Sequence, residues 1–527
     1  MVRRGSWLRV FILNNTDTAG SLRLSFGTKL AFGSGAMAEA VYMGLFNTFI
    51  TIFYNQVIGL SNTLIGIAIM LALVGDALTD PVVGILSDRW RGRYGRRHPF
   101  MFVAPVPLAL MVYCIFNPPE GLVEGSHQLG LFLWLALTTI LSRAFLTLYS
   151  VPHLALGGEL SKDQFQRSQL FSANTMIGAA SGALVAISTW GYFFAGERVR
   201  ASDGQLVPGH LDPAAYGPMV ICACAAIVIA VWGCALLTLK HVERLTEAPA
   251  PTERFTIIIL FREILGTFKN RNYLILMVGY FFFMITSGIY DTFNVFINTY
   301  FWELAPEEIK YFGFIALPMI IVGALASPVL QKKFDRKPVI VTALIFMTIF
   351  AQLVIDLRLL GLLPANHDED LLPILIANAG AFALTIGVGG VAIMGMIGDL
   401  IDENELTTGL RQDGLFFSAR AFFAKASYSV GHLFAGLALD LYVRLPFEAV
   451  PGQLEEAILT RMGIVAGPAM AFSAVIAVFV YSRYDLTAAR HREIVVALKK
   501  RNDDLSSDEM RPKMATRPSD NDTAFDA

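Results

Sequence analysis

GDALTDPVVGILSDRWRGRYGRRHPF (Gly75–Phe100) closes an apolar run that begins near residue 62 and is long enough to cross a membrane. Two carboxylates, Asp76 and Asp80, lie inside that run. A charge at the bilayer centre costs about 2.5–3.5 kcal/mol on insertion scales, so acids placed there are candidates for function. Immediately after the run come five arginines: Arg89, Arg91, Arg93, Arg96 and Arg97. Basic residues at the end of a span mark its cytoplasmic side.

The composition of the whole chain is that of a membrane protein. Of its 527 residues, 55% are hydrophobic and only 16% are charged, whereas ordinary soluble domains carry about 25% charged residues. The net charge of −2 gives no overall basic field, so no nucleic-acid partner is expected. The four cysteines lie in apolar runs and indicate small buried side chains, not a disulfide frame or a metal site: Cys114, Cys222, Cys224 and Cys234.

Twelve apolar runs are long enough to form membrane-spanning helices. They are too long and too evenly apolar for the strands of a membrane barrel. The sequence therefore predicts an all-α membrane protein with twelve transmembrane helices. Their approximate limits are 30–54, 62–87, 99–116, 129–156, 168–194, 217–239, 273–300, 311–331, 338–360, 372–397, 413–441 and 462–482.

The twelve spans divide into two groups of six around a polar central segment. That segment contains a Pro/Ala linker and then FTIIILFREILGTFKN, which predicts an amphipathic interfacial helix. Each half has a basic loop between its second and third spans, SDRWRGRYGRRHPF and QKKFDRKPVI, as expected of a duplicated carrier. The predicted divisions are an N-terminal arm (1–29), two six-helix bundles (30–239 and 273–482), the central loop (240–272) and a largely disordered tail (483–527).

Basic residues are concentrated in alternate loops, and their distribution predicts that both termini lie in the cytoplasm. The first residues, MVRRGSWLRVFIL, imitate a signal peptide, but Arg9 interrupts the apolar core and no small-residue cleavage site follows. We therefore expect a cytoplasmic arm at the N-terminus. The predicted location is the inner (cytoplasmic) membrane, crossed many times, with the lipid bilayer as surroundings.

Asp76 and Asp80 are four residues apart and share one face of a helix. Thr79 lies beside them, and Pro81 removes a backbone donor one step later. Such a pair either forms salt bridges with a neighbouring helix or binds a cation. Lys425, in ARAFFAKASYSVG, lies deep in its own span. The two acids and the lysine sum to −1, so one monovalent cation would neutralise the cluster and make it cheaper to rearrange in low dielectric.

Other polar side chains are also buried in the apolar runs. Arg143 lies deep in the fourth span, and Thr147 and Ser150 follow one and two turns later. In the seventh span a polar stripe follows helical spacing, and it serves either hydrogen bonds between helices or contact with a substrate. The residues expected near a central cavity are Glu39, Tyr42, Arg143, Ser150, His153, Asp291, Asn294 and Asn298.

Between about Lys29 and Arg483 the chain resembles the glycoside–pentoside–hexuronide:cation symporters of the major facilitator superfamily, the melibiose-permease group. The resemblance rests on DALTDPVVGILSDRWRGRYGRRHPF, VPHLALGGELSKD and IGDLIDENELTTGLRQDGLFFSARAFFAKAS. It implies the major facilitator fold and a coupling cation, Na⁺ or H⁺, with no other cofactor. The cation-binding positions carried over are Asp76, Thr79, Asp80, Thr147 and Lys425, with Asp76 and Asp80 as the acidic ligands if the cation is Na⁺.

The sugar-binding positions of that family are not matched. An acid of the fourth helix is replaced by Ser150, a neighbouring aromatic by Leu154, and a first-helix acid by Ala40, which follows Glu39; a fifth-helix arginine falls near Thr175. The expected function is cation-coupled symport of a glycoside or related sugar by alternating access. The alternative is a carrier of a lysophospholipid-like or other amphipathic solute, because the same branch includes lysophosphatidylcholine carriers.

Charged residues near the predicted inner ends of spans are candidates for a cytoplasmic gate. These charges either remain solvated, or Arg89, Arg93 or Arg97 pair there with Asp399, Asp402 or Glu403; Asp88 and Arg167 belong to the same set. A membrane enzyme or a channel is less favoured, since the histidines are scattered and no HExxH, phosphate loop or paired-cysteine motif occurs. The expected partner is a small-molecule substrate, and the expected state is a monomer.

Overall fold

The structure is a computed structural model that describes residues 24–125, 127–161, 163–200, 203–244, 266, 268, 270–409, 412–487 and 489–501. Most of the predicted N-terminal arm, most of the predicted interfacial helix and the predicted tail beyond residue 501 lie outside these residues. The described chain is almost entirely helical, with one short antiparallel hairpin in which Arg198 pairs with Val207.

The described residues of the first half form nine α-helices, a β-hairpin and several π- or 3-10-helical turns. Their bounds are α1 (Phe26–Ser34), α2 (Ala36–Ile52), η1 (Phe53–Val57), α3 (Asn62–Arg89), α4 (His98–Val103), α5 (Pro105–Ile115), α6 (Glu120–Glu124), α7 (Gln128–Glu159), α8 (Gln164–Ser188), η2 (Thr189–Phe193), β1 (Glu197–Val199), β2 (Leu206–Pro208), η3 (Gly209–Leu211), α9 (Pro213–Thr238) and η4 (Leu239–Arg244).

The second half is built in the same way. Its elements are α11 (Arg271–Phe296), η5 (Ile297–Phe301), α12 (Pro306–Phe334), α13 (Arg336–Leu359), α14 (Leu371–Thr408), α15 (Asp413–Leu437), η6 (Ala438–Val443), α16 (Glu456–Ile464), η7 (Val465–Ala469) and α17 (Met470–Tyr481). A further helix covers residues 489–501.

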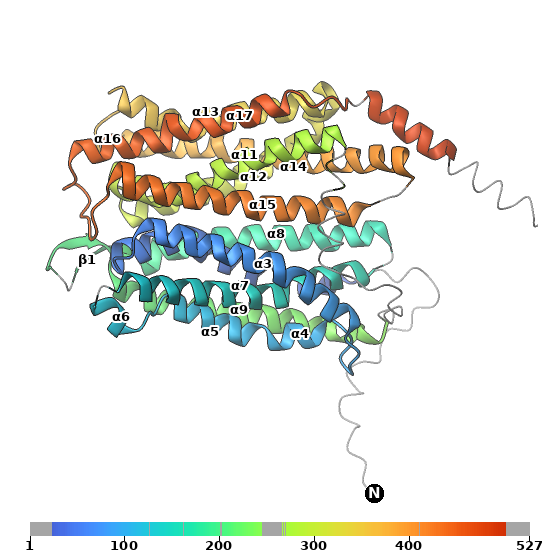
Figure 1. Ribbon diagram of the computed structural model, residues 1–527, viewed down its shortest axis with the longest axis horizontal. Coiled ribbons are helices and arrows are strands. Elements are labelled where there is room, and N and C mark those ends of the chain that lie inside the picture. The colour runs from blue at the N-terminus through green and yellow to red at the C-terminus, as the bar shows by residue number, and fades with distance from the viewer. Residues whose placement is uncertain are drawn as a thin grey trace, which may run out of the picture.

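These helices agree with the twelve predicted spans to within a few residues at most ends. Eleven of them, within the described residues, are long and apolar enough to cross a membrane. The twelfth is α15 with η6, which packs against α3 and α11 and runs along the bundle (Figure 1). The tenth prediction is wrong at its end, because α14 continues past residue 397 to Thr408 and carries four acids on its last turns, Asp399, Asp402, Glu403 and Glu405.

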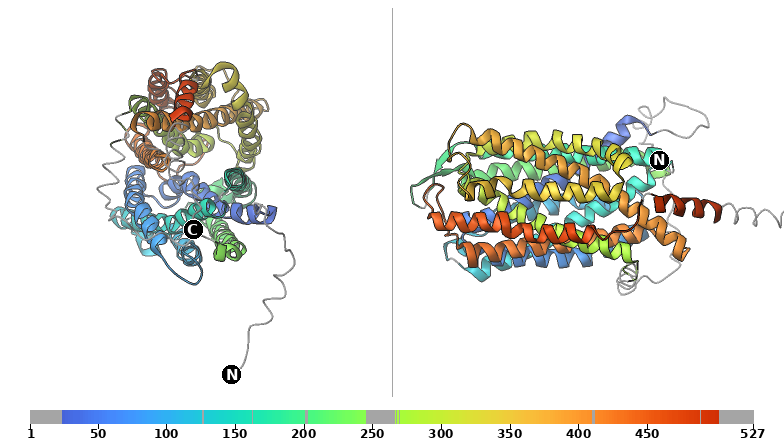
Figure 2. Two further views of the ribbon diagram at one scale, coloured as in Figure 1. Left: turned by 90° about the vertical axis from the view of Figure 1, so that its right-hand side faces the viewer. Right: turned by 90° about the horizontal axis from the view of Figure 1, so that it is seen from above.

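The spans form two bundles that lie side by side, one from α1 to α9 and one from α11 to α17 (Figure 2). Figure 1 shows the β1–β2 hairpin at one end of the molecule and the helix 489–501 at the other. We call the first end, with the hairpin and loops 302–305 and 444–455, the hairpin end. The opposite end, which carries the Arg89–Arg97 loop, we call the basic end.

Apolar side chains cover the outside of the bundles, as a bilayer requires. Along α3, Leu78, Val82 and Leu86 recur every fourth residue and are 52%, 50% and 46% exposed. The acids of the same helix face the other way, since Asp76 is only 3% exposed. Helix α3 therefore presents one apolar face to lipid and one polar face to its neighbours.

At the hairpin end the two bundles share a continuous core. Buried aromatic residues of the first bundle, such as Phe53 and Tyr54, belong to one apolar cluster with Phe296 and Tyr300 of the second. Polar contacts cross at the same end: the Tyr300 hydroxyl donates to Gln56 Oε1 at 3.0 Å. A second apolar cluster, with Tyr273 and Tyr481, joins the second bundle to the helix 489–501. The bundles are thus joined at the hairpin end.

A carboxylate of the second bundle caps a helix of the first. Asp440, in η6, accepts hydrogen bonds from the backbone N–H of Asn62 (3.1 Å), from Asn62 Nδ2 (2.9 Å) and from the backbone N–H of Thr63 (2.7 Å). These donors belong to the first turn of α3, where amide groups have no partner within the helix. Gly436 permits the close approach, because a Cβ there would lie 2.3 Å from the Asn62 carbonyl oxygen.

Candidate functional site

Helices α3 and α7 run in the same direction. Two polar residues of α7 contact two acids of α3, and both pairs have the same separation in the sequence. The Arg143 guanidinium donates to Asp76 Oδ2 from Nη2 at 2.7 Å and from Nε at 3.0 Å. One turn further on, the Thr147 hydroxyl donates to Asp80 Oδ1 at 2.8 Å. Both pairs are 67 residues apart in the sequence. The repeat of one helical turn on both helices brings the four side chains together.

Lys425 reaches the same acids from α15. Its Nζ lies 2.7 Å from Asp80 Oδ2 and 3.3 Å from Asp76 Oδ2. The structure thus brings together four of the five residues predicted for the cation site. The fifth, Thr79, donates weakly to the Asp76 carbonyl oxygen of its own helix at 3.5 Å.

Asp76 and Asp80 differ in the hydrogen bonds that their oxygens make and in their exposure. All contacts of Asp76 fall on Oδ2, while Oδ1 is buried without a hydrogen-bond partner. The side chains of Asp80 and Lys425 are each 35% exposed, so the cluster is open on that side. Carboxylate and hydroxyl oxygens are ligands for hard cations, and a carboxylate also accepts a proton. Within the described residues no three His, Cys, Asp or Glu side chains form a metal cluster, so a zinc-type site is not indicated there.

The charge count of the cluster differs from the count made on the sequence. The sequence suggested Asp76, Asp80 and Lys425, with a sum of −1. Arg143, considered as a substrate ligand, pairs with Asp76 and raises that sum to zero. Glu39 lies close enough to interact electrostatically with Lys425, Arg143 and Asp80. With Glu39 included, three acids and two bases sum again to −1.

The first-bundle residues proposed for substrate contact fall into two groups. Tyr42 lies near the cluster: its hydroxyl is 2.8 Å from the Ser142 hydroxyl, and its ring stacks on Phe46. His153 lies instead inside the bundle, where it is 2% exposed and its Nε2 is 3.0 Å from Asn174 Oδ1. His153 therefore packs within its own bundle.

Ser150 lies between these groups on α7 and is only partly exposed. It lies one turn beyond Thr147, which contacts Asp80.

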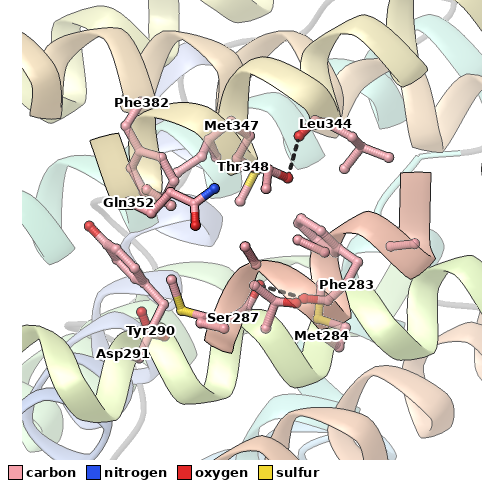
Figure 3. A pocket seen from close by; sticks show the side chains of 17 residues that line it. Phe283, Met284, Ser287, Tyr290, Asp291, Leu344, Met347, Thr348, Gln352 and Phe382 are labelled. Atoms are coloured by element: carbon pink, nitrogen blue, oxygen red, sulfur yellow. Dashed lines mark hydrogen bonds between the residues drawn. The ribbon is translucent and has the colours of Figure 1, made fainter. Parts of the chain in front are cut away.

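The seventh-span stripe lies on α11 and the following turn η5, and it borders two cavities. Asp291 accepts a hydrogen bond from the Tyr428 hydroxyl of α15. Asn298 Nδ2 donates to Asn294 Oδ1 at 3.1 Å. One cavity of about 340 Å³ is lined by Asp291, and another of about 330 Å³ is lined by Asn294 and Asn298. Figure 3 shows the first cavity, with Tyr290, Ser287 and Gln352 around it.

One face of α15 connects this stripe with the acids. Lys425 and Tyr428 are three residues apart and lie on neighbouring positions of that face. The first contacts Asp80 and the second contacts Asp291. One turn further, His432 Nδ1 is 2.6 Å from the Thr292 hydroxyl. A change at the acids can thus reach the α11 stripe through a single helix.

The predicted gate pairs are replaced by contacts within each bundle. Arg97 contacts Glu159 through Nη2 at 2.8 Å, Ser87 through Nη1 at 2.6 Å, and Asp88. Arg89 and Arg93 are exposed, and Arg167 donates to the Ser161 carbonyl oxygen at 3.3 Å. Arg97 and Arg167 therefore make their contacts within the first bundle in this conformation.

The acids of α14 are engaged in the second bundle. Asp399 contacts Arg336, and His491 Nε2 lies 3.2 Å from Asp399 and 3.0 Å from Asp402. Asn270 donates to Glu403 at 3.1 Å. In this conformation these acids thus contact Arg336, Asn270 and the helix 489–501, and the pairs with Arg89, Arg93 or Arg97 stay a prediction.

Several residues of the site were not identified from the sequence. Glu159 lies in the quoted motif VPHLALGGELSKD, so its position before a basic loop was the available signal. Tyr428 lies one turn from Lys425 and could have been found from that spacing. Asp440 and Gln352 carry no local signal, because their roles depend on how distant helices meet.

Comparisons with known proteins agree with this fold. The family described as MFS/sugar transport protein matches residues 31–488. An uncharacterised symporter of Synechocystis sp. is 24% identical, over 91% of this chain and 97% of that protein. The putative glycoside/cation symporter YagG of Escherichia coli is 24% identical, over 79% of this chain and 83% of its own length. The crystal structure of a D-xylose-proton symporter superposes with a TM-score of 0.58 at 14% identity, covering 88% of this chain and 98% of that one, which supports the fold.

Proposed function

The chain belongs to the MFS/sugar transport protein family, and from this premise we propose that it is a symporter that couples a monovalent cation to a glycoside or related sugar. It is a transporter and not an enzyme. The proposed cycle is alternating access, in which the two bundles open in turn at the hairpin end and at the basic end.

One observation carries the proposal: two membrane-buried acids on α3 meet a lysine on α15 of the other bundle. Lys425 Nζ is 2.7 Å from Asp80 and 3.3 Å from Asp76. An ion pair that joins the two moving bodies at the centre of the molecule can respond both to the bound cation and to the bundle arrangement. Asp76 Oδ1, buried and unpartnered, is the oxygen free to take that cation.

The proposed coupling rests on charge balance. The cluster of Asp76, Asp80, Glu39, Arg143 and Lys425 sums to −1, and one monovalent cation makes it neutral. Net charge in a low dielectric is expensive, so the loaded cluster rearranges at lower cost than the empty one. Because the Lys425 ammonium already lies against both acids, cation binding to Asp80 requires the lysine to move away. The carrier would then reorient readily only when loaded.

Na⁺ and H⁺ are both compatible with this cluster. The Thr147 hydroxyl beside Asp80 favours Na⁺, which prefers several oxygen ligands. A proton needs only one carboxylate. A Na⁺ site would use Asp76, Asp80 and Thr147, and a proton site would use Asp80 or Glu39.

A sugar substrate is supported by the family description and by the relative named as a putative glycoside/cation symporter. A second candidate is an amphipathic solute of lysophospholipid type. It is favoured by the apolar wall of the cavity beside α11, which includes Phe283, Met284, Leu344 and Met347.

We further propose that the protein lies in the inner membrane as a monomer, with the basic end and both termini in the cytoplasm. The basis is the run of arginines in the Arg89–Arg97 loop and the rule that cytoplasmic loops carry an excess of basic residues. In that orientation the conformation described here is closed toward the outside, because the bundle contacts lie at the hairpin end.

Uptake into proteoliposomes tests the coupling. Labelled methyl glycosides are offered to vesicles with an imposed Na⁺ gradient, an H⁺ gradient or neither. Accumulation should follow one gradient, and Asp80→Asn should lose accumulation while Asp203→Asn, an acid of the exposed hairpin loop, retains it. Gradient-driven accumulation by Asp80→Asn at the wild-type level would contradict the proposed site.

A further inference from the structure

The second bundle contains a cavity that the coupling site does not use. It lies between α11, α13, α14 and α17 and has a volume of about 340 Å³. Its walls are mainly apolar, with Phe283, Met347 and Ala474 from three of these helices. A cavity of this size is in the range of small-molecule sites, and an apolar cavity does not hold ordered water. The cavity is therefore suited to an apolar ligand group.

A second cavity adjoins the first and is more polar. The two share Tyr290, Ala351 and Phe382 in their walls. The second cavity, of about 330 Å³, also has Asn378 and, from the first bundle, Trp190. It therefore reaches the interface between the bundles. The two cavities thus share part of their walls. We call the first, apolar cavity the inner chamber and the second, more polar cavity the outer chamber.

The unpaired acceptor oxygens in the walls of the two chambers favour a ligand with hydrogen-bond donors. The hydroxyls of Ser287 and Thr348 already donate to carbonyl oxygens of their own helices, at 3.0 and 2.7 Å (Figure 3). By contrast, Gln352 Oε1 and Asn378 Oδ1 are buried without a partner. A buried acceptor left unpaired costs about 1–3 kcal/mol, so a donor in the chambers would be strongly favoured.

Gln352 lines the inner chamber. Figure 3 shows its carboxamide pointing into the cavity between Tyr290 and Met347. The preceding residue, Ala351, lines both chambers. A ligand that spans both chambers would place a hydroxyl beside Gln352 and its apolar part beyond it.

We propose that the inner chamber binds the apolar aglycone of a glycoside, while the sugar lies in the outer chamber and donates hydroxyl hydrogens to Gln352 and Asn378. This inference rests on the proposed function and specifies its substrate class: glycosides with an alkyl or aryl aglycone rather than free sugars. The Tyr290 and Phe382 rings, whose centroids lie 4.9 Å apart, pack against each other and form part of the wall that both chambers share.

The test is a ligand series that varies only the aglycone. Methyl, propyl, butyl and phenyl glycosides of three monosaccharides are added to the protein in lipid nanodiscs, with and without Na⁺, and affinity is read from thermal stabilisation. Each methylene buried in the inner chamber should tighten binding about fourfold. Affinity that is constant from methyl to butyl would overturn the proposal.

Two variants separate the chambers. Ala474→Phe fills the inner chamber and should reduce butyl-glycoside affinity to the methyl level without changing methyl-glycoside affinity. Gln352→Leu removes the carboxamide at similar size and should weaken all members of the series about equally. The matched control is Val475→Phe, which adds bulk at the next residue of α17, where the side chain is 58% exposed, and should change neither. Should Ala474→Phe not fold, Ala474→Val gives a smaller effect of the same sign.

The outcomes distinguish this inference from the proposed function. Chain-length dependence without any Na⁺ or H⁺ dependence would support the chambers and refute the coupling. Cation-dependent binding that Ala474→Phe leaves unchanged for every aglycone would refute the chambers alone. Stabilisation by lysophosphatidylcholine but by no glycoside would show that an acyl chain fills the inner chamber, and the sugar part of the proposal would be wrong.

Discussion

Replacing Asp440 should release the hairpin end. Its carboxylate accepts three hydrogen bonds from Asn62 and Thr63 across the bundle interface, the shortest at 2.7 Å. Asp440→Ala removes the acceptor of these three hydrogen bonds, while the Ser61 hydroxyl still accepts from the Leu64 N–H at 3.3 Å. Because these donors belong to one bundle and the acceptor to the other, the loss acts on the arrangement of the bundles and not on either bundle alone.

The expected magnitude follows from the capping contacts. Loss of an N-cap costs about 0.5–2 kcal/mol, and a hydrogen bond to a charged group contributes about 1.5–3 kcal/mol. Water replaces part of this at the end of the bundles, so a net value of about 2 kcal/mol is reasonable. This corresponds to about a 30-fold change in the ratio of closed to open hairpin ends. A protein closed in about 97% of molecules would then be closed in about half.

Distance measurement between spin labels provides the assay. Cysteines at Glu124 of the first bundle and Leu360 of the second, in a background without the four native cysteines, report the separation of the bundles at the hairpin end. Asp440→Ala should add a longer-distance population. Asp212→Ala is the matched control, since Asp212 caps α9 within its own bundle through the Ala214 N–H at 3.1 Å. A distance distribution in Asp440→Ala identical to wild type would refute the reasoning.

Three further predictions concern coupling, topology and pH. Lys425→Ala should leave Asp80 without its cationic partner and alter the cation concentration needed for half-maximal uptake; an unchanged dependence would make the lysine structural. A cysteine at Gly204 should react with an impermeant maleimide on intact cells and one at Gly92 should not; the reverse pattern would invert the orientation. Burial lowers the pKa of His210, in the hairpin-end loop, to about 3. Below its unfolded value of about 6.5 the unfolded chain binds a proton that the folded chain excludes, so its contribution to stability should fall by about 1.4 kcal/mol between pH 7.5 and 5.5. His210→Gln should lose this share of the pH dependence in thermal melts, and an equal slope in both proteins would assign it to other groups.

Periodicity made the spans and the acid pair predictable. Asp76 and Asp80 share a face because four residues make about one turn, and Lys425 was noticeable because a lysine so deep in an apolar run needs a partner. The contact of Arg143 with Asp76 was available in the same way, since Arg143 and Thr147 repeat the same spacing on α7. From the sequence alone, Arg143 could be placed either near a substrate or beside the acids, because spacing along one helix does not say which helix the side chain faces.

The relations between bundles were not predictable from local patterns. The gate residues at the basic end carry charges of complementary sign, but which charges pair depends on how far α14 extends and on which conformation the carrier adopts. The Asp440 cap depends on Gly436, whose missing side chain lets two helices of different bundles approach. The unpaired oxygen of Gln352 becomes visible only when its neighbours on other helices are placed.

Helix α3 contacts α15 and its continuation η6 at two points along its length. Asp440 holds the first turn of α3, and Lys425 holds Asp80 further along the same helix. The two contacts are about 27 Å apart along α3 at 1.5 Å per residue. If α3 pivots at the Asp440 contact, a tilt of about 10° moves Asp80 by about 5 Å. This displacement exceeds the length of the Lys425–Asp80 ion pair. A small rotation of one bundle about the Asp440 contact therefore separates Asp80 from Lys425. The ion pair can form in only one relative orientation of the two bundles.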